Sequence, residues 1–317
     1  MNTQQHITLK PYDPCLKATW DAAVQASRNG TFLHQRDYMD YHAKRFKDAS
    51  LMCYKGNRLV ALFPCNLTDG TCYSHQGLTY GGLLMLPEAK MNDVAEALEE
   101  IAKYFAARSC RQIIYRAIPS IYHRNAAEED LYQLHRMGAV LSGRSASTTI
   151  VQGQQQFSKL RTRLLHKAIL AGLHVAQSHE YPDFWPVLEE NLMSRHHVRP
   201  VHTLDEMVQL SRHFRQHIHL FNVYDNRHDI VAGCIVYETD TVAHAQYIAS
   251  TATGRRWGAT SLLFHHLLNE VYAEKPFFDL GISTEQEGRV LNEGLQRFKE
   301  SLGGRTTVYD TYTLKLT

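Results

Sequence analysis

Two arginines and two glycines lie together in residues 253–260, directly before a stretch with helical periodicity. The segment reads Thr253-Gly254-Arg255-Arg256-Trp257-Gly258-Ala259-Thr260. The start of a helix concentrates unpaired N–H groups and a partial positive charge, which suit an anion. Glycine also lets the backbone approach a ligand closely. The segment therefore has the materials of an anion site, and the alternative is a plain strand-to-helix turn.

Glu285 is the first candidate for a general base. It follows the predicted strand Phe277–Leu280, at the end where ligands collect in open α/β sheets, and Ser283 and Glu287 lie beside it. Burial near paired strands would raise the pKa of a carboxyl group toward neutrality, where proton transfer is efficient.

His202 is the second candidate. It belongs to a polar connection between two predicted helices that also contains His196, His197, Arg199 and Glu206. The alternative is structural, because this segment also has the residues of a helix cap.

A third group of polar residues lies on the predicted strand 242–251. Strict alternation places His244, Gln246 and Ser250 on one face of this strand and Tyr247 on the opposite face. An imidazole, an amide and a phenol are all able to hold or transfer a proton beside a ligand, so Tyr247 is a third catalytic candidate.

Patterns for other chemistries are weak. His213 and His217 are four residues apart and His265-His266 form a pair, but no third ligand is evident, so we predict no metal. Gly143-Arg144-Ser145-Ala146 lacks the second glycine of a serine nucleophile elbow. Cys234 lies in an apolar strand, and the sequence contains no nucleotide-binding signature.

The elements that would position these residues occur twice along the chain. Each half contains a strand hairpin, a third strand, an amphipathic helix, a further strand, a helix that ends in glycine, and a β-rich tail. The matched segments are 51–67 and 219–238, 72–79 and 242–251, 94–107 and 262–272, 113–117 and 277–280, and 140–151 and 306–316. This order predicts an α/β (mixed α+β) fold with two tandem domains, residues 1–152 and 153–317. Each domain is expected to be a mixed, mostly antiparallel sheet flanked by helices.

Three segments of the second half carry a resemblance to a known family. They are Lys167-Ala168 with Gly172-Leu173-His174-Val175, then Phe278-Asp279-Leu280-Gly281-Ile282-Ser283, and the stretch from Leu291 to Gly304. The last is similar to the closing motif N-x-G-L-x-x-F-K-x-x-F-G, with Leu302 in place of an aromatic residue. The chain resembles the GNAT superfamily of N-acyltransferases, in the doubled form of the Fem-type peptidoglycan aminoacyltransferases and the tandem-GNAT proteins of bacterial envelope gene clusters.

The resemblance implies that an acyl-CoA pyrophosphate binds at Arg255, Arg256, Gly258, Ala259 and Thr260. Arg255 and Gly258 match the first two fixed positions of the pattern Q/R-x-x-G-x-G/A, whereas Thr260 stands where glycine or alanine is usual. The corresponding loop of the first half, Tyr80 to Pro87, has glycines but no cation. We therefore expect a degenerate or acceptor-binding first domain. The expected substrate-binding residues are His197, Arg199, Gln246, Ser283, Asn292, Lys299 and Tyr80.

The resulting hypothesis is an N-acyltransferase that moves an acyl group from acetyl-CoA or another acyl-CoA to an amine. The acceptor would be an amino sugar or an amino-acid precursor of cell-envelope polysaccharide. One alternative uses aminoacyl-tRNA, with the basic helix around Lys159–Lys167 on its phosphates. Another is an inactive GNAT-fold binding protein.

Bulk composition fits a globular chain. Hydrophobic residues make up 44% and charged residues 21%, and the formal net charge of +2 gives no indication of a DNA partner. The polar start, the short apolar runs and the six scattered cysteines predict a cytoplasmic protein with reduced thiols and no membrane span.

Overall fold

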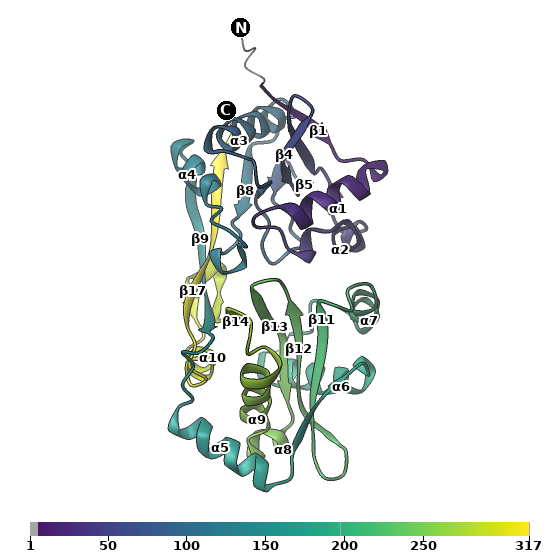
Figure 1. Ribbon diagram of the computed structural model, residues 1–317, viewed down its shortest axis with the longest axis vertical. Coiled ribbons are helices and arrows are strands. Elements are labelled where there is room, and N and C mark those ends of the chain that lie inside the picture. The colour runs from purple at the N-terminus through teal and green to yellow at the C-terminus, as the bar shows by residue number, and fades with distance from the viewer. Residues whose placement is uncertain (1–5, 197, 317) are drawn as a thin grey trace. The chain divides into compact units, whose positions relative to one another are not determined.

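A computed structural model describes residues 6–196 and 198–316. The chain divides into two compact units, and in each of them helices pack on strands (Figure 1). Unit 1 is Met1–Ser145, Glu285–Val290 and Val308–Thr317, and unit 2 is Ala146–Thr284 and Leu291–Thr307. The predicted mixed α/β class is confirmed. The units cut the chain differently from the predicted domains 1–152 and 153–317, because the chain returns to unit 1 twice after residue 284.

Unit 1 contains one sheet with the strand order β1-β3-β4-β7 and a second group of strands in the order β17-β8-β6-β5-β2. Strands β6 and β8 run parallel. The bounds are β1 Ile7–Pro11, α1 Lys17–Ala26, α2 Arg36–Met39, β2 Lys47–Asp48, β3 Leu51–Lys55, β4 Arg58–Phe63, β5 Asn66–Thr68, β6 Thr71–Tyr73, β7 Leu84–Met85, α3 Met91–Ala106, β8 Gln112–Arg116, α4 Glu129–Arg136 and β17 Arg305–Lys315.

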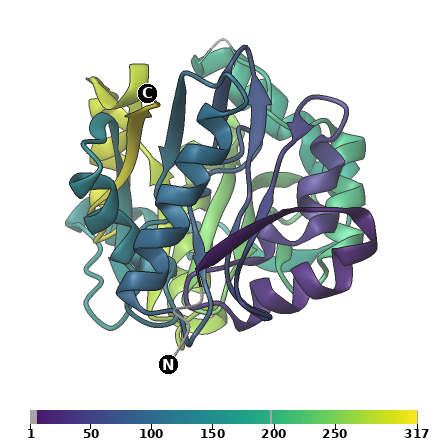
Figure 2. The ribbon, with the colours of Figure 1, turned by 90° about the horizontal axis from the view of Figure 1, so that it is seen from above.

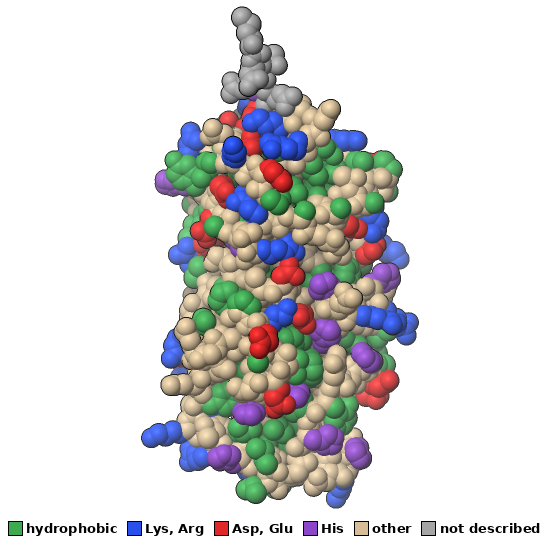
Figure 3. All heavy atoms as spheres, viewed as in Figure 1, with side chains coloured by type: hydrophobic (Ala, Val, Ile, Leu, Met, Phe, Trp, Pro, Cys, Tyr) green, Lys and Arg blue, Asp and Glu red, His purple; other side chains and the backbone are tan. Residues whose placement is uncertain are grey.

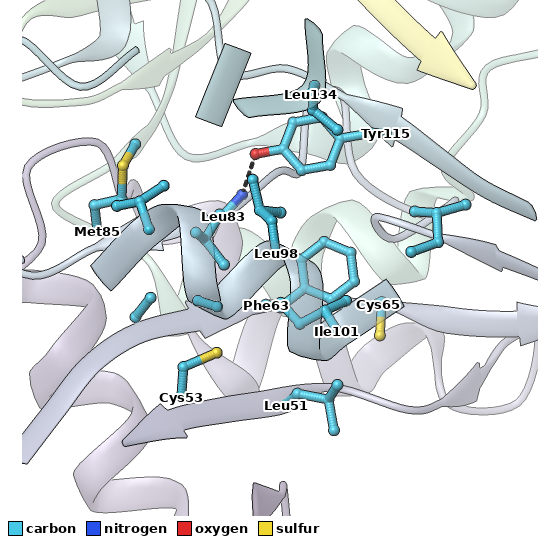
Figure 4. Close-up of a cluster of buried hydrophobic side chains, with 14 of the residues drawn as sticks. Leu51, Cys53, Phe63, Cys65, Leu83, Met85, Leu98, Ile101, Tyr115 and Leu134 are labelled. Atoms are coloured by element: carbon cyan, nitrogen blue, oxygen red, sulfur yellow. Dashed lines mark hydrogen bonds between the residues drawn. The ribbon is translucent and has the colours of Figure 1, made fainter. Parts of the chain in front are cut away.

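Helix α3 supplies much of the core of unit 1. Val94, Leu98, Ile101 and Phe105 recur every three or four positions, so they share one face of the helix, and all four are buried. In Figure 2, α3 (blue) and α1 (purple) pack on the strands of this unit at separate places. Figure 4 shows the resulting cluster of apolar side chains around Tyr115.

Unit 2 contains the strand order β10-β11-β12-β13-β14-β9. Its pairs are antiparallel apart from β13 with β14, which is parallel. The bounds are β9 Val140–Val151, α5 Lys159–Leu170, β10 His174–Ser178, α6 Tyr181–His196, α7 Leu204–His213, β11 Ile218–Tyr224, β12 Ile230–Glu238, β13 Val242–Ser250, α8 Ala252–Trp257, α9 Ala259–His266, a π-helical turn η5 Leu267–Val271, β14 Phe277–Ile282, β15 Thr284–Glu285, β16 Val290–Leu291 and α10 Glu293–Glu300.

Helices cover both faces of the unit 2 sheet. Cys234 and Val236 of β12 pack with Leu263 and other apolar residues of α9. Gly233, the residue before Cys234, points the other way, because a Cβ there would lie 2.6 Å from the ring of Phe184 in α6. Figure 1 shows α9 and α6 on the two sides of β12. The sheet is therefore the middle layer of unit 2.

On the face drawn in Figure 3, basic and acidic side chains are interspersed. All six cysteines are unpaired, and five are buried, leaving Cys15 exposed. Among the residues that the structure describes, no helix combines the length and apolar character needed to cross a membrane.

Candidate functional site

Strands β13 and β14 pair only over the first residues of β13. Their parallel ladder ends at the pair His244 and Asp279, and β13 then continues to Ser250. Unit 2 contains a groove of about 600 Å³ beside the last residues of β13. The groove is lined by residues of α5, α6, β13, α10 and the junction of α8 with α9, namely Arg161, Leu164, Asn191, Ile248, Ala249, Ser250, Arg255, Gly258, Thr260, Asn292, Gly294, Leu295 and Phe298.

The segment predicted as an anion-binding loop is largely the short helix α8. Thr251 begins this helix, because its hydroxyl accepts the N–H of Gly254 at 3.0 Å. Gly258 ends it in the left-handed conformation, with φ of +79°, and α9 starts at once. The arginines and glycines are thus held by two consecutive helices instead of a loop.

Packing accounts for both glycines of this segment. A Cβ at Gly254 would lie 2.0 Å from the carbonyl oxygen of Val231, and one at Gly258 would lie 2.3 Å from that of Leu164. Glycine is therefore required here for the approach of β12 and α5, whether or not a phosphate binds.

The five residues expected to hold a pyrophosphate do not all face the groove. Arg255, Gly258 and Thr260 line it, whereas Ala259 is fully buried in the apolar core. Arg256 is exposed beside the ring of Trp257. Arg255 donates to the carbonyl oxygen of Ser250 at the end of β13, which fixes a cation at the edge of the groove.

The start of α9 adds hydrogen-bond donors to this edge. The first N–H groups of a helix have no partner within it, and in α9 they include that of Thr260, which lines the groove. Together with the Arg255 guanidinium, they make this end of the groove suited to an anion.

Helix α10 forms another part of the lining. Asn292 caps it by accepting the N–H of Leu295 at 3.0 Å, and also lines the groove. Lys299 is buried, and its ammonium group donates to the carbonyl oxygens of Gly281 and Ile282, both at 2.7 Å. Burial lowers the pKa of Lys299 to about 8. Asn292 thus combines a capping contact with access to the groove, whereas Lys299 fastens α10 to the end of β14.

A β-bulge in β13 overturns the predicted alternation along this strand. Tyr247 pairs with Ile235 and Ala245 with Val236, so Gln246 is the extra residue. Ala245 packs into the α9 core before the bulge and Ile248 packs against that core after it. Tyr247 therefore shares a face with His244, contrary to the prediction that they lie on opposite faces.

His244 is paired with a carboxylate that the sequence analysis did not single out. Its Nδ1 lies 2.8 Å from Oδ2 of Asp279, which is fully buried. The other oxygen of Asp279 accepts from the hydroxyl of Ser147 at 2.6 Å and from the N–H of Gly281 at 3.1 Å. A buried carboxylate that receives a histidine N–H is the arrangement that orients an imidazole base. Only its position after the apolar Phe277-Phe278 could have signalled it.

His202 and Tyr247, both predicted as catalytic, are in contact. The His202 Nδ1 lies 2.8 Å from the Tyr247 hydroxyl, and both side chains are buried. Burial raises the pKa of Tyr247 above its usual value. Trp185 of α6 packs edge-on against Tyr247, with ring centroids 6.2 Å apart.

The remaining predicted site residues are spread over both units. Glu285 is exposed and belongs to unit 1, in a short hairpin of β15 and β16. Ser283 is buried, and no partner is found for its hydroxyl in the described structure. Arg199 is exposed and Gln246 half-buried. His197 lies outside the described residues.

Tyr80 and the loop that follows it form hydrogen bonds with other residues of unit 1. The Tyr80 hydroxyl donates to that of Thr31 at 3.3 Å. The N–H of Leu83 donates to the Tyr115 hydroxyl at 2.7 Å (Figure 4), and that of Met85 donates to Asn29 at 3.0 Å. These backbone donors, which would face a phosphate in an active loop, are already used by protein oxygens.

Residues 154–300 match a protein-family model described as an acetyltransferase (GNAT) domain. The matched range holds every residue that lines the groove. FemX has a similar fold over the whole chain, with a TM-score of 0.67, 10% identity and 96% of each chain covered. Residues 154–300 therefore hold a GNAT acetyltransferase domain, and the chain as a whole has a tandem, Fem-like fold.

Two further solved structures have a similar fold over nearly the same length. A tandem GNAT protein from the clavulanic acid biosynthesis pathway shares 14% identity, covers 98% of this chain and 99% of its own, and gives a TM-score of 0.56. L-PGS from Bacillus licheniformis shares 11% sequence identity, covers 95% of this chain and 91% of its own, and gives a TM-score of 0.64. No curated protein sequence matches significantly. The tandem fold predicted from the sequence is confirmed, and the GNAT domain at residues 154–300 supports an acyltransferase.

Within the described residues, no group of three or more His, Cys, Asp or Glu side chains is arranged to hold a metal ion. His213 and His217 instead bond to backbone carbonyls, of Gln209 and Glu238.

Proposed function

We propose that this tandem GNAT protein transfers an acyl group from acyl-CoA to an amine. The acceptor is an amino sugar or amino-acid precursor of cell-envelope polysaccharide, a class that fits the Fem-like fold. The observation that carries the proposal is the end of the groove at Arg255 and Thr260, where a fixed cation lies beside the start of α9, whose first N–H groups have no partner within the helix. A diphosphate is the part of CoA that such an end would bind.

The groove also has apolar walls for the pantetheine arm. Leu164, Ile248, Leu295 and Phe298 contribute side chains to its lining. From its diphosphate end the groove follows β13, which leads back toward the point where β13 and β14 separate. This direction would bring a thioester toward the strand residues that carry polar groups.

The chemistry requires a proton acceptor and a donor to the oxyanion. The amine nitrogen attacks the thioester carbonyl, the C–N bond forms and the C–S bond breaks. The CoA thiolate takes up a proton and leaves as the thiol, and the amine gives up one proton to a base. We infer that His244, held through Nδ1 by Asp279, accepts that proton. Glu285, His202 and Tyr247 remain the candidates predicted from the sequence.

A thermal melt with acetyl-CoA and longer acyl-CoAs tests the donor. A ligand at a hundred times its dissociation constant stabilises the folded state by about 2.7 kcal/mol, which a melt detects. We expect a higher melting temperature with at least one acyl-CoA. Unchanged melting with all of them would overturn the proposal.

Aminoacyl-tRNA is the second candidate donor, because one helix presents an exposed basic face. Lys159, Arg163, His166 and Lys167 of α5 are all exposed, and α5 contains no acidic residue. Phosphate contacts would make RNA binding steeply dependent on salt. A melt that shifts with aminoacyl-tRNA and not with acyl-CoA would favour this donor.

A further inference from the structure

Trp257 stands apart from the other tryptophans of the chain. Its exposed fraction is 37%, whereas Trp20 and Trp185 are 0% and 5% exposed. Trp257 is the last residue of α8 and directly precedes Gly258, which lines the groove. A large aromatic ring is thus left accessible to solvent next to the proposed diphosphate end.

Two cations accompany this ring. The Lys167 ammonium group lies 5.2 Å from the ring centroid, and the Arg256 guanidinium lies 5.7 Å from it. The two come from different elements, α5 and α8, which contact each other in unit 2 (Figure 1). In the part of the chain that the structure describes, neither cation has an acidic partner within ion-pair distance.

These contacts leave the cations available to a ligand. Cation–π contacts at exposed sites are worth roughly 0.5–1 kcal/mol each, so a ligand ring can displace one of them from the face of Trp257. Base–aromatic stacking contributes about 1–3 kcal/mol per base, and lysine and arginine are the usual partners of phosphate. The cluster therefore supplies a stacking face and two phosphate-binding groups at one place.

Its position relates it to the groove. Leu164, one turn before Lys167 on α5, lines the groove, as does Gly258 after Trp257. A donor whose diphosphate lies at Thr260 would continue beyond the lining residues toward exposed surface on this side. Arg255 and Arg256 would then have separate tasks, the first on the diphosphate and the second outside the groove.

We propose that Trp257, Lys167 and Arg256 form a subsite for a phosphorylated adenosine, with the base on the Trp257 ring and the phosphate on the two cations. The inference rests on the proposed transferase function. Two donors carry this chemistry: CoA ends in a 3′-phosphorylated adenosine, and aminoacyl-tRNA ends in an adenosine attached to a phosphate.

Binding of CoA and of dephospho-CoA, which lacks the 3′-phosphate, tests the subsite in the intact chain. We expect CoA to bind the wild type more tightly than dephospho-CoA and to change the emission of the exposed Trp257. The variant Lys167→Ala/Arg256→Ala should weaken CoA binding by roughly fivefold to tenfold, as expected for two exposed phosphate contacts, and leave dephospho-CoA almost unaffected. The matched control Arg212→Ala/Arg227→Ala removes two exposed cations of the same unit and should change neither.

The outcomes separate the subsite from the transferase proposal. The subsite is wrong, and the transferase proposal stands, if CoA binds but the ratio of the CoA and dephospho-CoA affinities is the same in the double variant as in the wild type. The same holds if CoA does not change the fluorescence of Trp257, measured as the difference between the wild type and Trp257→Phe. If CoA does not bind the wild type, an RNA minihelix ending in CCA-3′ is titrated instead. Binding that the double variant weakens supports the subsite with tRNA as the source, and no binding overturns it.

Discussion

Lys299 joins the closing helix to the end of β14 through a single buried ammonium group. Its ammonium group donates hydrogen bonds to the carbonyls of Gly281 and Ile282. These bonds fix the chain two residues after Asp279, whose carboxylate contacts His244 and Ser147. The motif residue predicted to bind substrate therefore has a structural task, and any ligand contact of Lys299 would come in addition to it.

Lys299 makes stability depend on pH in a definite direction. Its pKa is about 8 in the folded chain, below the ordinary 10.5 that the unfolded chain keeps. Between these two pKa values the unfolded state binds more protons than the folded state, so the folded state becomes more stable as the pH rises. Relative to Lys299→Met, the free energy of unfolding of the wild type should increase by about 3 kcal/mol. Urea unfolding at pH 7 and pH 10 measures this, with the exposed Lys159→Met as the control. The same difference between wild type and Lys299→Met at both pH values would contradict the prediction.

Gly258 offers a second test at the scale of one residue. A Cβ there would lie 2.3 Å from a backbone oxygen of α5, so Gly258→Ala should displace α5 from α9 and cost about 3 kcal/mol or more. Gly153→Ala is the matched control, because Gly153 has nearly the same φ, +78°, with nothing within 4 Å of its Cβ position. It should cost only about 1 kcal/mol, the price of the left-handed conformation. Equal losses in the two variants, measured by urea unfolding, would rule out the packing explanation.

At the scale of elements, the sequence predicted most of the helices and strands of the back half. Strands β11, β12 and β13 lie at the predicted segments 219–238 and 242–251. Two features of the back half were not predicted from the sequence. A bulge at Gln246 has no signature in alternation alone, and it reverses the face of every later residue in β13. The Thr251 cap makes a helix of a glycine-containing segment that looked like a loop.

The candidate site could be predicted from the sequence only in part, for the same reason. The groove residues Arg255, Thr260 and Asn292 could be predicted, because they belong to motifs that are short in sequence. Asp279 and Trp257 could not, since their roles depend on contacts with Ser147 and Lys167, which are distant in the chain.

Asn292 permits a prediction at the start of α10. Its side chain caps the helix, so Asn292→Ala should cost about 1 kcal/mol of stability, whereas Asn292→Ser keeps a capping oxygen and should cost less than half of that. If Asn292 also contacts the donor, both variants should weaken acyl-CoA binding equally, since both lose the amide. Urea unfolding and a binding titration separate the two roles, and full binding by Asn292→Ser would show that the cap is the only role.

At the scale of the whole molecule, unit 1 contains an acid-sensitive group of buried histidines. Burial lowers the pKa of His34 to about 4 and that of His75 to about 3. His42 and Arg36 also face this region, and the rings of His42 and His75 are 5.9 Å apart. Protonating either histidine in the folded state is therefore costly.

Stability should fall on acidification. An unfolded histidine takes up its proton near pH 6.5, so stability is intact above that value and is lost as the pH falls toward 4 and 3, by about 2 kcal/mol per histidine at pH 5. His75→Asn should reduce this loss, because asparagine tolerates the φ of +68° at this position. His228→Asn, at φ +63° on the surface, is the control. Identical loss between pH 7 and pH 5 in wild type and His75→Asn would contradict the assignment.

The central claim is that unit 2 holds an acyl-CoA by its diphosphate at the junction of α8 and α9. A crystal structure of the protein grown with acetyl-CoA tests this most directly. We predict diphosphate oxygens within hydrogen-bond distance of the Arg255 guanidinium and the N–H of Thr260, with the pantetheine arm between Ile248 and Leu295. A bound acetyl-CoA whose diphosphate lies elsewhere, or a groove left without it at saturating concentration, would contradict the claim.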